Sequence, residues 1–104
     1  QQRMAKPGLE AVLGLQAFGD GQYDTAFGHL VQARDTMQLA GGSHAQRDIF
    51  ERMTIDAGIR AGQFDRAGAI LDQRQVLRGN TEDGYAAARR VLIEASRAAS
   101  FAAQ

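Results

Sequence analysis

Histidine and carboxylate side chains come closest together near the middle of the chain, where they could serve as metal ligands. His44 and Asp48 are four residues apart, so on a helix they share a face at a spacing that suits two ligands. A third ligand would have to come from His29 or Glu51, which are not adjacent in the sequence. We therefore favour a hydrogen-bonded pair of His44 and Asp48 that fixes the start of a helix, and we predict no metal and no cofactor.

The same stretch could hold a small anion. Two glycines at 41–42 and the following serine offer free backbone amides at a helix start, with an arginine close by, as in many phosphate and sulfate sites. The candidate anion-binding residues are Gly42, Ser43, His44 and Arg47. The alternative is ordinary turn chemistry, in which the glycines end one helix and the Ser43 and Gln46 side chains form a capping box that begins the next.

Candidate catalytic groups are few. Ser43 directly precedes His44, but adjacent side chains at a helix start point apart, and the other serines lie near the C-terminal tail. The neighbouring carboxylates of Glu82 and Asp83 lie at an expected helix start, where negative charge is favourable without a catalytic role. We therefore do not expect an enzyme.

Composition narrows the remaining classes. The 104 residues carry twelve basic and twelve acidic side chains, so neither nucleic acid nor an anionic membrane surface is an expected partner. Without cysteine, disulfides and thiolate metal sites are excluded. The apolar runs are short, which indicates a soluble, cytoplasmic protein with no membrane segment. Because residue 1 is not methionine, we expect a part of a longer protein.

Apolar residues recur at steps of three and four along the whole chain, and no segment alternates like a strand. The fold class is therefore all-α, with about five helices in a single domain spanning 1–104. We expect a first hairpin at 8–39, a second at 43–78 and a capping helix at 81–102. Pro7 should lie in the first turn of the first helix.

Three local features of the later helices are also predicted. The pattern of apolar residues in the third helix is interrupted from Thr54 to Asp56, which should narrow the buried face of that helix. Gly79 and Asn80 suit the left-handed conformation past a helix end, and Thr81 should cap the last helix. The apolar face of that helix consists of Tyr85, Ala88, Val91, Leu92, Ala95 and Ala99.

A shift of 41 residues superposes the two hairpins in sequence. It places Gly21 on Gly62, Tyr23 on Phe64, Asp24 on Asp65, Ala26 on Ala67 and Leu30 on Leu71. Such helix pairs cannot bury their apolar faces alone and must stack on neighbours. The sequence therefore predicts a stack of helical hairpins.

The first copy resembles the tetratricopeptide repeat. Its matching residues are Leu13, Gly14, Gly21, Tyr23, Ala26, Leu30 and Ala33. The second copy keeps Gly62, Phe64, Ala67 and Leu71, but has Arg74 where the pattern has its last alanine. The stretch 41–48, continued to Leu71, is more specifically similar to the C-terminal part of the tetratricopeptide repeat protein 38-like family. The resemblance implies a right-handed superhelix of helix pairs that binds other molecules.

The resemblance further implies that the first helix of each pair lines a concave groove. The expected partner-binding residues there are Leu15, Phe18, Arg52, Asp56 and Ile59. An apolar wall with one arginine and one aspartate would suit a protein or peptide partner that presents a helix. Alternatively, Leu15 and Phe18 pack on the last helix or on further repeats. Exposed apolar surface on the first helix also predicts a homo-oligomer, formed through the first two helices or by exchange of the last.

Overall fold

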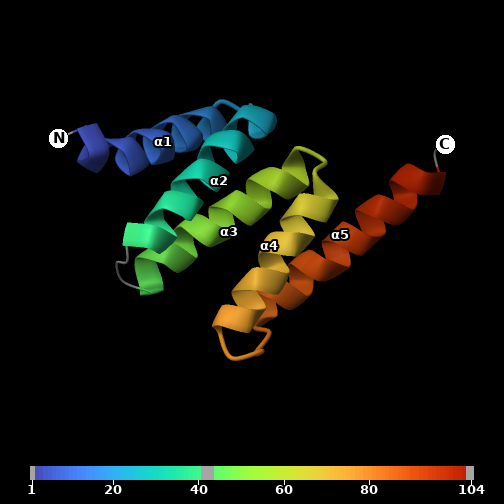
Figure 1. Ribbon diagram of the computed structural model, residues 1–104. Coiled ribbons are helices and arrows are strands. Elements are labelled where there is room, and N and C mark those ends of the chain that lie inside the picture. The colour runs from blue at the N-terminus through green and yellow to red at the C-terminus, as the bar shows by residue number, and fades with distance from the viewer. Residues whose placement is uncertain (1, 41–43, 103–104) are drawn as a thin grey trace.

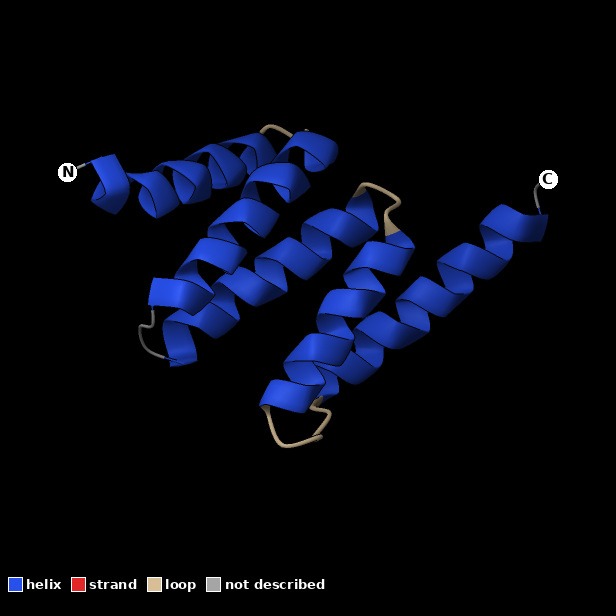
Figure 2. Cartoon of the chain, viewed as in Figure 1, coloured by secondary structure: helices blue, strands red, loops and turns tan. Residues whose placement is uncertain are grey.

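The computed structural model describes residues 2–40 and 44–102, and the side chains of residues 8–36 and 48–99. This part of the chain forms five helices and no strand, which confirms the all-α fold class (Figures 1 and 2). The helices are α1 Gln2–Gly19, α2 Tyr23–Ala40, α3 His44–Arg60, α4 Phe64–Leu77 and α5 Gly84–Ala102.

The helices form a row in which each packs against the next one in sequence, as Figure 1 shows. The chain runs back and forth, so that α1 and α5 lie at opposite ends of the row. The molecule is a flat body of 50 × 33 × 17 Å, and packing becomes looser from the α1–α2 pair to the α4–α5 pair. The inner helices therefore lie between two neighbours, whereas α1 and α5 each have one outer side uncovered, and α5 contacts α3 as well as α4.

Glycine and asparagine conformations explain where helices end. Gly21 and Gly62 adopt φ angles of 80° and 79° in the two matching turns, a region that side chains with a Cβ atom rarely occupy. After α4, Gly79 and Asn80 adopt φ angles of 71° and 63°, as predicted for this pair. In both hairpins, the turn between the two helices thus depends on a glycine with a positive φ angle.

The core lies where α2, α3 and α4 meet. Its largest fully buried apolar side chains are Phe27 and Leu30 from α2, Ile55 from α3 and Leu71 from α4. Gly58 lets α2 approach α3 closely, because a Cβ atom there would lie 2.8 Å from the Phe27 ring. The middle of the row is therefore held by close apolar packing.

Two predictions about α1 and α3 are wrong in detail. α1 begins at Gln2 instead of residue 8, because the residues before Pro7 have good helix propensity, and the proline lies inside the helix. The buried face of α3 is not narrowed at Thr54, which is fully buried. The Thr54 hydroxyl can be buried because it donates a hydrogen bond of 2.7 Å to the carbonyl oxygen of Phe50.

The start of α5 also differs from the prediction. Thr81 lies outside the helix, which begins at Gly84. The Asp83 carboxylate accepts a hydrogen bond of 2.9 Å from the backbone N–H of Ala86 and so occupies the capping position. Asp83 is favoured there because its carboxylate also binds an arginine of α4.

Candidate interaction surface

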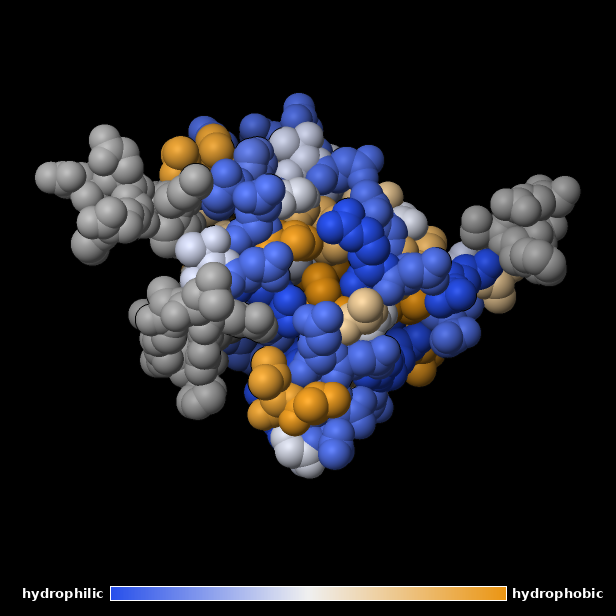
Figure 3. Space-filling model, in the orientation of Figure 1, coloured by the Kyte–Doolittle hydropathy of each residue, from blue (hydrophilic) through white to orange (hydrophobic). Residues whose placement is uncertain are grey.

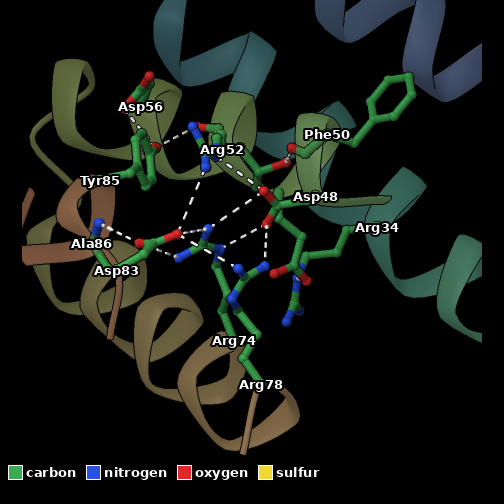
Figure 4. Close-up of polar contacts among 12 residues, drawn as sticks. Arg34, Asp48, Phe50, Arg52, Asp56, Arg74, Arg78, Asp83, Tyr85 and Ala86 are labelled. Atoms are coloured by element: carbon green, nitrogen blue, oxygen red, sulfur yellow. Dashed lines mark hydrogen bonds and ion pairs between the residues drawn. The ribbon is translucent and has the colours of Figure 1, made fainter. Parts of the chain in front are cut away.

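A cluster of arginines and aspartates joins α3, α4 and the loop before α5. We call Asp48, Arg52, Arg74, Arg78 and Asp83 the arginine–aspartate cluster (Figure 4). Arg74 is 3% exposed, and its guanidinium donates hydrogen bonds of 2.8 Å to Asp48 and 2.9 Å to Asp83. Arg52 also donates to Asp48, at 3.0 Å, and Arg78 lies at the edge. The buried guanidinium therefore ties the start of α5 to α3.

Protonation equilibria in the cluster favour the charged forms. The hydrogen bond from Arg74 lowers the pKa of Asp83 far below its ordinary value, with help from the N–H of Ala86. Burial raises the pKa of Asp48, but hydrogen bonds and charge from Arg74 and Arg52 outweigh it and lower the pKa overall. The hydrogen bond to Asp83 correspondingly raises the pKa of Arg74. The cluster is thus a set of ion pairs that stays charged near neutral pH.

Tyr85 in the first turn of α5 is surrounded by arginines. The guanidinium carbons of Arg89 and Arg52 lie 4.3 and 4.6 Å from its ring centre. Its hydroxyl lies 2.9 Å from the Asp56 carboxylate and 2.9 Å from the carbonyl oxygen of Arg52, so it can donate to either. Burial, followed by the charge of Asp56, raises the pKa of Tyr85. Tyr85 therefore anchors α5 on α3.

Two of the predicted groove residues, Arg52 and Asp56, therefore already have partners within the molecule. Arg52 binds Asp48 and covers the Tyr85 ring, while Asp56 accepts hydrogen bonds from Tyr85 and from Arg89 at 3.0 Å. A partner that binds the Asp56 carboxylate would therefore compete with Tyr85 and Arg89 of α5.

The apolar groove residues have different surroundings. Leu15 is 39% exposed. Phe18 packs edge-on against Tyr23, with ring centres 5.3 Å apart and the Arg60 guanidinium above it, while Ile59 packs on the core. Partner binding through the five predicted groove residues stays a prediction.

The predicted anion site falls mostly outside the described residues. Gly42 and Ser43 lie outside the described residues, and the side chains of His44 and Arg47, and of Gln46 from the expected capping box, are not described. The backbone of α3 does begin at His44, in agreement with a helix start at this point. Anion binding by these four residues stays a prediction.

The candidate third metal ligands have other partners. His29 Nδ1 lies 2.7 Å from the Glu10 carboxylate, and the Glu51 carboxylate accepts a hydrogen bond of 2.7 Å from Arg34. Among the side chains that the structure describes, which do not include that of His44, no three histidines or carboxylates are grouped so that they could hold a metal ion.

Sequence reasoning missed the two buried arginines. Arg34 of α2 is 6% exposed and links Glu51 to Gln73, at 2.7 and 2.8 Å, and Arg74 holds the cluster described above. The sequence carried a signal for both. Each arginine follows a core leucine by one helical turn, Leu30 and Leu71, so it continues a buried stripe. An arginine at such a position indicates a buried ion pair.

A shallow groove of about 310 Å³ separates α4 and α5. It is lined by charged residues together with small and apolar ones, among them Gly68 and Ile93. Two ion pairs connect α4 and α5 along its length, Arg90 with Asp72 and Arg97 with Asp65, both at 3.0 Å. Both arginines therefore already contact carboxylates within the molecule, while the exposed Glu94 also lines the groove.

The two end helices expose apolar side chains. We define the outer face of α1 as Leu9, Val12 and Leu15, and the outer face of α5 as Ala88, Val91, Leu92, Ala95 and Ala99. All eight residues are exposed, Val12 at 57% and Val91 at 70%. On the face of the molecule in Figure 3, by contrast, hydrophobic surface is broken into small separate patches. The end faces are thus apolar surfaces that run along a helix.

Most of the apolar residues that the sequence analysis names for the last helix lie on the outer face of α5. Apart from Tyr85, the predicted apolar face points to solvent, while Ala86, Ile93 and the half-buried Arg89 and Arg90 face the neighbouring helices. The physical reason is that α3 and α4 present carboxylates and a glutamine toward α5. Ion pairs with these groups turn the charged side of α5 inward.

In the described part of the chain, no helix is long and apolar enough to cross a membrane. Comparisons with protein-family models, with curated proteins and with solved structures find no match for this chain.

Proposed function

We propose that this chain is an interaction module that binds a partner helix through an apolar end face of its helical row, without catalysing a reaction. The observation that carries the proposal is the orientation of α5, whose charged side faces inward and whose apolar side faces solvent. Water-exposed apolar helix faces mark docking sites for amphipathic helices. The resemblance to tetratricopeptide repeats supports the same role.

The surroundings of the polar side chains support a role in binding a partner more than a role in catalysis. The buried arginines, the cluster aspartates and Tyr85 are held by partners within the molecule. Among the described side chains, every buried nitrogen and oxygen atom has a hydrogen-bond partner. Groups satisfied in this way stabilise the fold and are not free to act on a substrate.

The test is affinity capture with the immobilised chain at low micromolar density, compared with Val91→Glu and Leu77→Glu. Val91 and Leu77 are both 70% exposed, but Leu77 lies on α4 outside both end faces, so it is the matched control. We expect the unaltered chain and Leu77→Glu to retain the same proteins. Val91→Glu should retain at least tenfold less of them. Equal retention by all three proteins would contradict the proposal.

A further inference from the structure

The outer faces of α1 and α5 match each other in charge. Among residues 8–19, the only charged side chain is Glu10, which contacts His29 of α2 and is not on the outer face. The five residues of the outer face of α5 are also uncharged; the nearby arginines bind carboxylates of α3 and α4, and the exposed Glu94 is adjacent to this face in the sequence. Surfaces depleted of charge are typical of the centre of a protein interface. The residues that define the two faces can therefore pack together without burying an unpaired charged side chain.

The two faces also match in shape. Leu9, Val12 and Leu15 follow each other at steps of three and form a ridge of large side chains. On α5, Val91, Ala95 and Ala99 follow at steps of four, and the two alanines leave a shallow row beside Leu92. A ridge with step three that enters a groove with step four gives the near-parallel packing of helix bundles, at a crossing angle of about 20°.

From these observations, and resting on the proposed function, we infer that one partner of these faces is a second copy of this chain, bound end to end. The outer face of α1 in one copy packs on the outer face of α5 in the next. The contact is heterologous, since the two faces differ, and each added copy leaves one face of each kind free. The protein therefore assembles into rows of increasing length.

The size of the faces sets the expected strength. A helix of 18 residues is about 27 Å long and about 10 Å wide, so one contact buries only ~300 Å² on each copy. Stable dimers bury about 800 Å² on each partner. The association should accordingly be weak and visible only at high protein concentration.

The experiment is sedimentation equilibrium of the complete chain from about 20 to about 500 μM, well above typical specific affinities. We expect the average mass to rise at least twofold over this range and to pass beyond that of a dimer. A protein that remains monomeric throughout would overturn the inference. The capture experiment above uses concentrations too low for this self-association. If Val91→Glu no longer captures a different protein there, the proposed function is supported even when the chain is monomeric.

Complementary variants test the pairing of the two faces. Val12→Glu damages only the α1 face, and Val91→Glu damages only the α5 face. Each variant alone should be monomeric, whereas an equimolar mixture should form a dimer and nothing larger, because each partner retains one intact face. If Val12→Glu alone forms dimers, two α5 faces pair with each other. If Val91→Glu alone forms dimers, two α1 faces pair with each other. Either result would overturn the end-to-end arrangement.

Circular dichroism should show unchanged helix content, since both positions are exposed. If either variant is unfolded, Leu9→Glu and Ala95→Glu replace the pair, with the same outcomes expected.

Discussion

The middle of the row and its C-terminal end are held together by different forces. Where α2 meets α3, fully buried apolar side chains interlock and Gly58 allows close contact. Where α5 meets α3 and α4, the buried apolar residues among the described side chains of α5 are Ala86 and Ile93, and arginine–carboxylate pairs and Tyr85 supply most of the specific contacts. The apolar core therefore fixes the hairpins, whereas ion pairs determine which side of α5 faces outward.

Phe27→Ala should have the largest effect on stability. It leaves a cavity at the centre of the α2–α3 contact, where Phe27 is fully buried, and such changes cost about 3–5 kcal/mol. We expect the thermal transition of the whole domain to fall or disappear, as measured by circular dichroism. A loss confined to α5 would contradict the assignment of the core to the middle helices.

Asp83→Asn should loosen α5 selectively. Asparagine can still cap the helix, but Arg74 loses one of its two charged partners, a change that costs about 1–3 kcal/mol. Hydrogen exchange should accelerate in α5 more than in α2. Equal acceleration in both helices would show that the cluster supports the entire domain instead of the C-terminal helix.

Acid should release α5 before it melts the core. The pKa values of Asp83 and Asp48 are lowered in the folded protein, so the unfolded state binds more protons as the pH falls. The stabilisation from these groups is complete above their ordinary pKa of 3.8 and declines as the pH falls below it. Tyr85 fluorescence should therefore change between about pH 4 and pH 2 earlier than the far-ultraviolet signal. Phe27→Ala, if folded, provides a control in which the core melts first.

Asp65→Asn should have the smallest effect. Like Asp83, Asp65 pairs with an arginine, but both Asp65 and its partner Arg97 are more than half exposed. Exposed pairs contribute about 0–1 kcal/mol, and the contribution decreases with salt. Urea denaturation should show a midpoint close to that of the unaltered chain. A loss as large as that of Asp83→Asn would mean that burial does not distinguish the two ion pairs.

The sequence alone was enough to predict the five helices and the ends marked by glycine or asparagine, because the relevant signals are local. Apolar spacing marked all five helices, and Gly21, Gly62 and the Gly79–Asn80 pair end them as expected. The buried stripes of α2 and α4 also followed from spacing, since both helices lie between two neighbours. Local signals failed for Thr81, because the choice of Asp83 as the cap depends on Arg74 from another helix.

Only the tertiary structure decided which surfaces are buried and which are exposed. The spacing of Ala88, Val91, Leu92 and Ala95 defines an apolar side of α5 but does not state whether that side meets the protein or solvent. The partners of Arg74 and Tyr85 come from segments up to 33 residues away, so their positions depend on how the hairpins stack. Sequence thus determined the helices, and the packing of α3 and α4 determined the face that α5 presents.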